Sequence, residues 1–152
     1  MVGIRQWLCR HLCKPKEASF KPQHLEHIGF TEIYTILQAE YPDTPIFIGD
    51  RDYKTIPLSE LKKYLRHDDT DRHQYVDEYY DCDDFSFRLM GNLSNSSWGA
   101  LPFGIMWTQT ENGGAHAVNL FIDNNREVWV VEPADDSIRK MHEGWKPYLI
   151  II

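Results

Sequence analysis

The sequence lacks a long apolar run and has few cysteines. No stretch of 18 apolar residues occurs, so no transmembrane helix is expected. The apolar run at the N-terminus is too short and too broken to indicate a signal peptide. Cysteine occurs only at Cys9, Cys13 and Cys82, and an odd number argues against a fully paired disulfide framework. These absences predict a cytoplasmic protein.

Positive charge is also scarce. The chain has 16 basic and 23 acidic residues, which gives a formal net charge of −7. Because phosphate backbones and anionic lipids attract positive charge, we expect neither a nucleic acid nor a membrane as the main partner. There is no internal repeat and no low-complexity linker. With 152 residues, of which 42% are hydrophobic, the chain is predicted to form one domain, 1–152, whose oligomeric state stays open.

The first half of the chain, residues 1–74, shows mainly helical periodicity. Apolar residues at helical spacing predict a helix over residues 3–13 and two more that follow the candidate N-caps Thr31 and Ser59. Residues 46–48 are a candidate short strand. This half is therefore predicted to be helical.

The second half, residues 75–152, has a different pattern. Phe85, Leu89 and Leu93 recur at helical spacing and predict a helix from Cys82 to Leu93. Strands are expected at residues 103–108, 115–122, 127–131 and 148–152. Helices first and then a meander of strands is the pattern of an α+β fold with an antiparallel sheet.

Three residues with reactive side chains take special places in this layout. Cys82 begins the predicted helix, where free N–H groups and the positive end of the helix dipole stabilise a thiolate and an oxyanion. His116 begins a strand, and Glu132 ends the next one. A histidine can take the thiol proton, and a carboxylate can hold the imidazole by its other nitrogen. The order predicts a Cys–His–Glu triad.

Each residue also has a plain structural interpretation. A lone cysteine before an apolar helix is usually buried and inert, and acidic neighbours oppose its ionisation. His116 shares its strand face with Val118 and Leu120, so it should emerge from an apolar sheet face. The triad requires that the cysteine helix pack against that same face.

The segments YDCDDFSFRLMG, GGAHAVNLFID and VWVVEPADD resemble a known group of enzymes. Their order is that of papain-like cysteine peptidases, and they look most like the C-terminal peptidase domain of the fairy-ring mushroom agglutinin family. The resemblance covers about Tyr75 to Asp136. It implies a papain-like core in which Cys82 is the nucleophile, His116 the base and Glu132 the orienting acid. No sugar-binding β-trefoil repeat is present, so the lectin activity of that family does not carry over.

The resemblance also implies calcium dependence. Asp83 and Asp84, directly after the cysteine, are candidate calcium ligands, and Asp135 and Asp136 are further candidates. The alternative is that the first pair caps the helix and the second pair forms a turn. No organic cofactor is implied.

An oxyanion donor is expected upstream of the cysteine in this fold. The candidate is Gln74, with the Cys82 backbone N–H as the other donor. Trp98 and Trp107 are candidates for lining a substrate cleft, although aromatic residues more often belong to the core.

These observations predict a cysteine hydrolase, a peptidase that cleaves protein or peptide substrates. Two alternatives within the same chemistry are an NlpC-type cell-wall amidase and a transglutaminase-like acyl transferase. The NlpC-type enzymes usually have serine and glycine where this chain has Asp83 and Asp84. A third alternative, of a different class, is a non-catalytic binding module that retains the fold.

Overall fold

The computed structural model describes residues 21–152. The predicted helix over residues 3–13 lies outside this range. The helices are α2 (Phe30–Glu40), α3 (Leu58–Leu65), the 3-10 turn η1 (Thr70–Arg72) and α4 (Cys82–Leu93). The strands are β1 (Glu26–Gly29), β2 (Ile46–Phe47), β3 (Asp52–Thr55), β4 (Phe103–Gln109), β5 (Ala115–Ile122), β6 (Val128–Glu132), β7 (Ser137–Arg139) and β8 (Lys146–Ile151).

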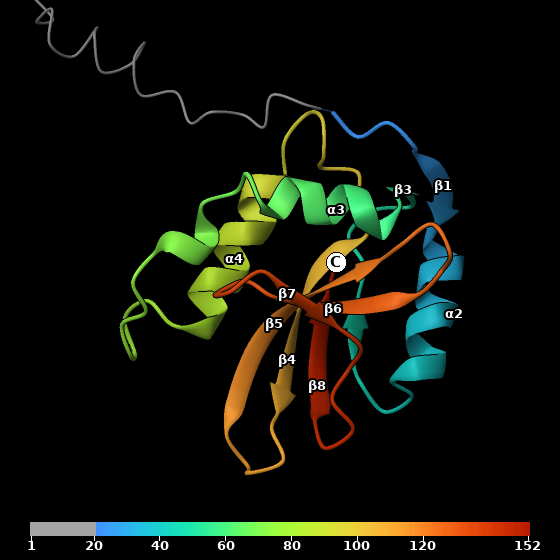
Figure 1. The fold of residues 1–152 in the computed structure, drawn as a ribbon. Coiled ribbons are helices and arrows are strands. Elements are labelled where there is room, and N and C mark those ends of the chain that lie inside the picture. The colour runs from blue at the N-terminus through green and yellow to red at the C-terminus, as the bar shows by residue number, and fades with distance from the viewer. Residues whose placement is uncertain (1–20) are drawn as a thin grey trace, which may run out of the picture.

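A six-stranded sheet in the order β2-β8-β4-β5-β6-β7 forms the centre of the fold. Strands β8, β4, β5, β6 and β7 pair antiparallel, whereas β2 runs parallel to β8. Strands β1 and β3 form a separate antiparallel pair. In Figure 1 the sheet lies in the middle, with α2 on the right and α3 and α4 above and to the left.

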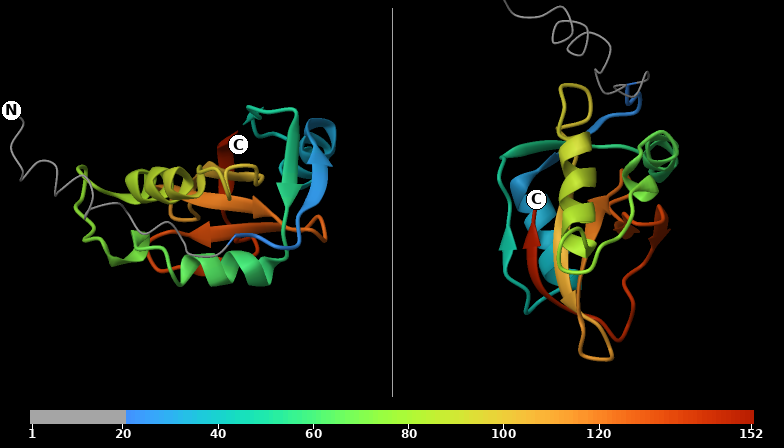
Figure 2. Two further views of the ribbon diagram at one scale, coloured as in Figure 1. Left: turned by 90° about the horizontal axis from the view of Figure 1, so that it is seen from above. Right: turned by 90° about the vertical axis from the view of Figure 1, so that its left-hand side faces the viewer.

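The two faces of the sheet are covered by different helices. One core joins Ile33 and Leu37 of α2 to Val118 and Leu120 of β5. The other core joins α3 and α4 to the side chains that alternate with these on the strands, among them Phe121. The sheet therefore lies between two apolar layers, and Figure 2 shows α4 lying along the strands.

Helix α4 has the bounds expected from its periodicity, and its start is fixed by a capping box. The Asp81 side chain accepts a bond from the backbone of Asp84, and the Asp84 carboxylate accepts the Asp81 N–H at 3.2 Å. The first turn is also rich in acid, which suits the helix dipole. The other expected caps are wrong, because α2 is preceded by Gly29 and α3 by Pro57.

The expected order of helices first and then an antiparallel sheet is also corrected. Strands β1, β2 and β3 are interspersed with the early helices, and β2 adds a parallel pair to the sheet. Strands β1, β3 and β7 were not expected, since each has only three or four residues and carries a weak alternation signal. Strands β4, β5, β6 and β8 lie within two residues of their expected bounds.

Candidate functional site

Cys82 is the first residue of α4 and is partly exposed. Burial raises the pKa of its thiol, while the Ala117 backbone N–H, which bonds the sulfur, acts in the opposite direction. The charges of Asp81 and Asp83 add to the increase. The thiol is therefore held in its protonated form at neutral pH, despite its place at the helix N-terminus.

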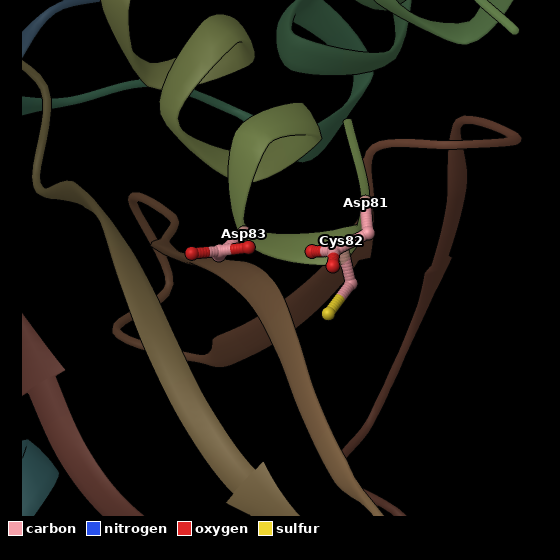
Figure 3. A group of neighbouring side chains, drawn as sticks. All are labelled: Asp81, Cys82 and Asp83. Atoms are coloured by element: carbon pink, nitrogen blue, oxygen red, sulfur yellow. The ribbon is translucent and has the colours of Figure 1, made fainter. Parts of the chain in front are cut away.

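Two carboxylates flank the thiol. Ligand atoms of Asp81, Cys82 and Asp83 lie within 4.8 Å of one another. Figure 3 shows the sulfur pointing down toward the strands, whereas the Asp83 side chain extends to the left. A hydrogen bond with Asp81 raises the pKa of Asp83 and lowers that of Asp81. The titrations of these two neighbouring carboxyl groups are therefore linked.

His116 and Glu132 lie together, as expected. The Nε2 atom of His116 is 2.8 Å from Glu132 Oε2, and the side chains are 24% and 13% exposed. Arg139 approaches the same Glu132 oxygen at 3.8 Å. The His116 ring also meets the edge of Trp145, with centroids 5.3 Å apart. This is a pre-formed polar pair beside an aromatic ring at one end of the sheet.

The cysteine helix covers the opposite face of the sheet from the one expected. Val118 and Leu120, which share the face of His116 on β5, pack in the core of α2. Leu89 and Leu93 of α4 pack in the other core. Between residues 21 and 152, no hydrogen bond joins the Cys82 sulfur to His116. The two residues still lie near each other along β5, because the sulfur bonds Ala117.

The predicted calcium ligands fall at two separate places. Asp84 is engaged in the capping box, and Asp83 belongs to the group beside the thiol. Asp135 and Asp136 form the turn between β6 and β7, where Asp135 Oδ1 accepts the Ser137 N–H at 2.9 Å. The four candidates therefore do not form one site.

Asp136 has surroundings that the sequence did not indicate. Its pKa is raised to about 6, first by burial and next by the charge of Asp71, with Asp68 and Asp135 following. Its Oδ1 atom and that of Asp71 are both buried and accept no hydrogen bond. Buried carboxylate oxygens without hydrogen bonds are ligands that a hard cation prefers, and Arg72 lies 3.8 Å from the Asp71 oxygen as the nearby positive charge.

The remaining candidates do not line a site. Gln74 is exposed in the loop that precedes α4. Trp98 is only 2% exposed in the core with α3 and α4, and it lines a cavity of about 140 Å³ there rather than a cleft beside His116. Trp107 is partly exposed and packs edge-on against Phe87 of α4, with centroids 5.8 Å apart.

Sequence reasoning missed Trp145, Arg139 and Asp71. Arg139 lies over the Trp145 ring at 5.1 Å from its centroid, so the two residues form part of the surroundings of the His116–Glu132 pair. In the sequence, Arg139 and Trp145 are distinguished only as a basic and an aromatic residue in the polar stretch after Asp136. Their contacts depend on the β7–β8 connection, which a periodic pattern does not reveal.

Two solved structures share the fold over part of their length. A PSL1a–E64 complex matches with a TM-score of 0.73 and 21% identity, over 83% of this chain and 51% of that one. The lectin of Polyporus squamosus, bound to the human-type influenza-binding epitope Neu5Acα2-6Galβ1-4GlcNAc, matches with a TM-score of 0.70 and 20% identity. That match covers 83% of this chain and 49% of the lectin. The chain thus spans about half the length of each.

No curated protein matches this chain in sequence. In the part of the chain that the structure describes, no helix is long and apolar enough to cross a membrane.

The comparisons correct the prediction of a cysteine peptidase with a papain-like core. The family model that matches residues 30–152 describes a lectin C-terminal domain, and one of the neighbouring structures is named as a lectin with a bound glycan. The expectation of a hydrolase with a protein or peptide substrate is corrected with it, as are the alternatives of a cell-wall amidase and an acyl transferase. Burial raises the pKa of the Cys82 thiol, and no hydrogen bond between residues 21 and 152 joins its sulfur to His116. The non-catalytic binding module is the alternative that agrees.

The resemblance to the peptidase domain of the mushroom agglutinin family is corrected by a direct match. The model of a family described as the ricin-type β-trefoil lectin C-terminal domain matches residues 30–152. This range contains α2 and every later element, including the whole sheet and the His116–Glu132 pair. The chain therefore belongs to the family of ricin-type β-trefoil lectin C-terminal domains.

Proposed function

We propose that this chain is a non-catalytic binding domain of a lectin-type protein and that its ligand is a glycan. The proposed contact residues are His116 and Glu132, with Cys82 at the border of the site. The observation that carries the proposal is the His116–Glu132 pair, which is bonded at 2.8 Å and is still partly open to solvent. Binding needs little reorganisation when such groups are already in place.

The chemistry of the pair suits a sugar. A sugar hydroxyl both donates and accepts hydrogen bonds, and a carboxylate accepts while an imidazole offers one donor or acceptor on its free nitrogen. The His116 Nδ1 atom has no bonding partner within residues 21–152. The apolar face of a pyranose ring packs on aromatic side chains, and Trp145 lies beside His116.

The family match and the bound glycan of the Polyporus squamosus lectin support a carbohydrate ligand. That lectin is about twice as long as the matched segment, so its glycan does not by itself indicate where this domain binds. The protonated thiol of Cys82 fits a binding role better than a nucleophilic one.

Calorimetric titration with Neu5Acα2-6Galβ1-4GlcNAc and with Galβ1-4GlcNAc tests the proposal. We expect wild-type binding and a loss of at least about tenfold in His116→Ala, equivalent to about 1.4 kcal/mol. His27→Ala is the matched control, because His27 is an exposed histidine that pairs with Asp52 at 2.9 Å away from this site. Absence of wild-type binding to both sugars would contradict the proposal.

A second test concerns catalysis. Casein and short peptides should stay intact during long incubation with the full chain, with and without calcium. Incubation with E64, the compound in complex with PSL1a, should leave the mass of the chain unchanged after dialysis. Casein hydrolysis that disappears in Cys82→Ala, or a permanent E64 adduct on Cys82, would overturn the non-catalytic proposal.

We also propose calcium as a bound ion, held by Asp71 and Asp136 rather than by Asp83 and Asp84. The support is the pair of buried carboxylate oxygens without hydrogen bonds and the raised pKa of Asp136. A bound cation would add to the positive charge of Arg72, which lies 3.8 Å from Asp71 Oδ1, and would hold the β6–β7 turn against the loop that contains η1. Asp84 is already engaged in the capping box of α4.

Thermal melting with and without calcium tests the ion site. Calcium should raise the melting temperature of the wild type, and Asp136→Asn should abolish most of the increase. Asp83→Asn, a matched acid at the thiol, should retain it. An increase that Asp83→Asn abolishes and Asp136→Asn retains would place the ion at the thiol instead.

A further inference from the structure

A turn shortly before α4 exposes apolar side chains. Tyr75, Val76 and Tyr79 are 53%, 43% and 85% exposed, and we call residues 75–79 the aromatic turn. The turn is fixed to the fold, because the Tyr79 N–H donates to the Val76 carbonyl oxygen at 3.0 Å and the Tyr75 ring stacks on Phe85 of α4. Single exposed apolar residues are common on any surface, whereas several on one fixed turn mark a contact surface.

Carboxylates surround the aromatic turn. Among the seventeen residues 68–84, eight are acidic and one, Arg72, is basic. Arg72 and Arg88 pair with acids of the loop that contains η1. Asp77 and Glu78, within the turn, are exposed and form no ion pair with any other residue in the described range. The apolar surface is therefore bordered by negative charge that the rest of the fold does not neutralise.

The opposite charge is concentrated at the beginning of the chain. Residues 1–20, which we call the N-terminal segment, contain one acid, Glu17, and have a net charge of +3. Residues 21–152 have a net charge of −10. The basic residues of the N-terminal segment are Arg5, Arg10, Lys14 and Lys16. Charges separated in this way attract the two parts of the chain to each other.

The N-terminal segment also has an apolar pattern that suits the aromatic turn. The helix that its periodicity predicts over residues 3–13 would place four apolar side chains on one stripe, those of Ile4, Trp7, Leu8 and Leu12. A short helix of this kind gains most of its stability by packing its apolar stripe against another surface. A surface that is both apolar and acidic matches such a basic, amphipathic segment.

The beginning of the described chain lies within reach of the aromatic turn. The Gln23 N–H donates to the Glu60 carboxylate at 2.9 Å, so the chain enters beside the first turn of α3. Helix α3 has eight residues and is therefore about 12 Å long. Figure 1 shows the chain continuing from α3 to the start of α4. Twenty residues span about 30 Å even as a helix, which is enough to reach this loop.

We propose that the N-terminal segment docks on the aromatic turn of its own chain. Its apolar stripe covers Tyr75, Val76 and Tyr79, and its basic residues face the acids of the turn. The turn ends three residues before Cys82, so the docked segment lies next to the partly exposed thiol. This contact does not depend on the glycan-binding function proposed above.

Paramagnetic relaxation in the full chain tests the proposal. A spin label is attached to Cys9 in the variant Cys13→Ser/Cys82→Ser, and amide signals are followed by NMR. We expect the Tyr79 amide to broaden severalfold more than that of Thr35. Thr35 is the reference because it is exposed on α2, which covers the other face of the sheet (Figure 1).

A matched pair of tyrosine variants identifies the surface. Tyr79→Ser should decrease the docking equilibrium constant about tenfold and remove most of the broadening at the neighbouring Val76 amide. Tyr34→Ser, which changes an exposed tyrosine of α2, should leave the broadening unchanged. An increase in salt from about 0.05 M to about 0.5 M should weaken the contact as well, because it screens the charges.

A mixed sample distinguishes contact within one chain from contact between two copies. It combines isotope-labelled chain that has no spin label with spin-labelled chain that is invisible to the NMR experiment. We expect no broadening of Tyr79 in this mixture. Broadening in the mixture would show docking on a second copy and overturn the proposal. Equal broadening of Tyr79 and Thr35, or broadening of Val76 that Tyr79→Ser leaves unchanged, would also overturn it.

Discussion

The two faces of the central sheet differ in what they leave open. The face under α2 ends in the His116–Glu132 pair, and Trp145, which meets the His116 ring, also lines a cavity of about 570 Å³. The face under α3 and α4 is covered by Phe85, Leu89 and Trp98, none of which is more than 2% exposed, and the thiol of Cys82 lies at its border. A smaller cavity, of about 140 Å³, lies on this face beside Met90 and Leu93. Open polar groups beside an aromatic wall indicate binding, whereas a protonated thiol beside acids does not indicate catalysis.

Asn119 shows how tightly the α4 face is organised. It is fully buried on β5 and donates to the carbonyl oxygens of Ser86 and Gly104, each at 3.0 Å. One side chain thus ties α4 to two neighbouring strands. On the α2 face, the Thr44 hydroxyl donates to the Pro147 carbonyl oxygen at 3.1 Å and ties the turn after α2 to β8.

The largest expected effect is at Gly104, where the sheet is closest packed. A Cβ atom there would lie 2.2 Å from the Ile151 carbonyl oxygen, so Gly104→Ala would force β4 and β8 apart. We expect a loss of about 3 kcal/mol or more in the free energy of unfolding, measured in urea. Gly91→Ala is the control: it meets nothing within 4 Å inside α4 and should stabilise by about 0.5–1 kcal/mol.

The next effect tests the bridge on the α4 face. Asn119→Ala removes both hydrogen bonds and leaves a small void, so we expect about 1–3 kcal/mol of destabilisation. Asn112→Ala, in the exposed turn between β4 and β5, should change stability by less than about 0.5 kcal/mol. Equal effects for the two variants would refute a special role for Asn119.

A pH effect is expected from Asp136. Its folded pKa of about 6 lies above the ordinary 3.8, so the folded chain keeps a proton that the unfolded chain loses. Stability should therefore decrease as the pH rises from about 4 to about 6, and the contribution should be constant above that.

Melting temperatures in calcium-free buffer from pH 4 to 8 measure this effect. Asp136→Asn should flatten the decrease and melt higher than the wild type at pH 7. Asp77→Asn, an exposed aspartate in the loop before α4, is the control and should follow the wild-type curve. The melting temperature of the wild type could instead increase between pH 4 and pH 6, with the same increase in Asp136→Asn. That result would show that the pKa of Asp136 is not raised.

The smallest stability effect is expected at Glu132. Glu132→Gln keeps the shape of the side chain but removes the ion pairs with His116 and Arg139, which are partly exposed. The free energy of unfolding should change by less than about 1 kcal/mol. Sugar affinity should decrease more than stability does. A larger loss of stability than of affinity would make the pair structural.

Parts of this account could be predicted from the sequence. The bounds of α4 and β5 were predicted correctly. A capping residue precedes the helical spacing of apolar residues in α4, and a glycine pair precedes the alternation of residues in β5. Alternation also placed His116 and Glu132 on one sheet face, where they do meet. It did not reveal which helix covers that face. Alternation along a strand shows which residues share a face of the sheet, but it does not show which helix packs against that face.

The rest depended on contacts between distant segments. Trp145 reaches His116 from the β7–β8 connection, and Asp71 reaches Asp136 from η1. No local pattern encodes such contacts. The same limit applies to the wrong enzyme prediction. The positions of Cys82, His116 and Glu132 on a helix and two strands predicted that these residues lie near one another. The pKa of the thiol, however, depends on its burial and on nearby acids, which the spacing does not reveal.

The most direct test of a non-catalytic site is the rate of alkylation of Cys82 by iodoacetamide from pH 5 to 9, followed by mass spectrometry. Because burial raises the pKa of the thiol, the rate should be very low near pH 6 and should increase only at alkaline pH, no faster than at Cys9 and Cys13. His116→Ala should not change it. Rapid alkylation near pH 6 that His116→Ala abolishes would reveal a thiolate paired with an imidazolium and would contradict the account.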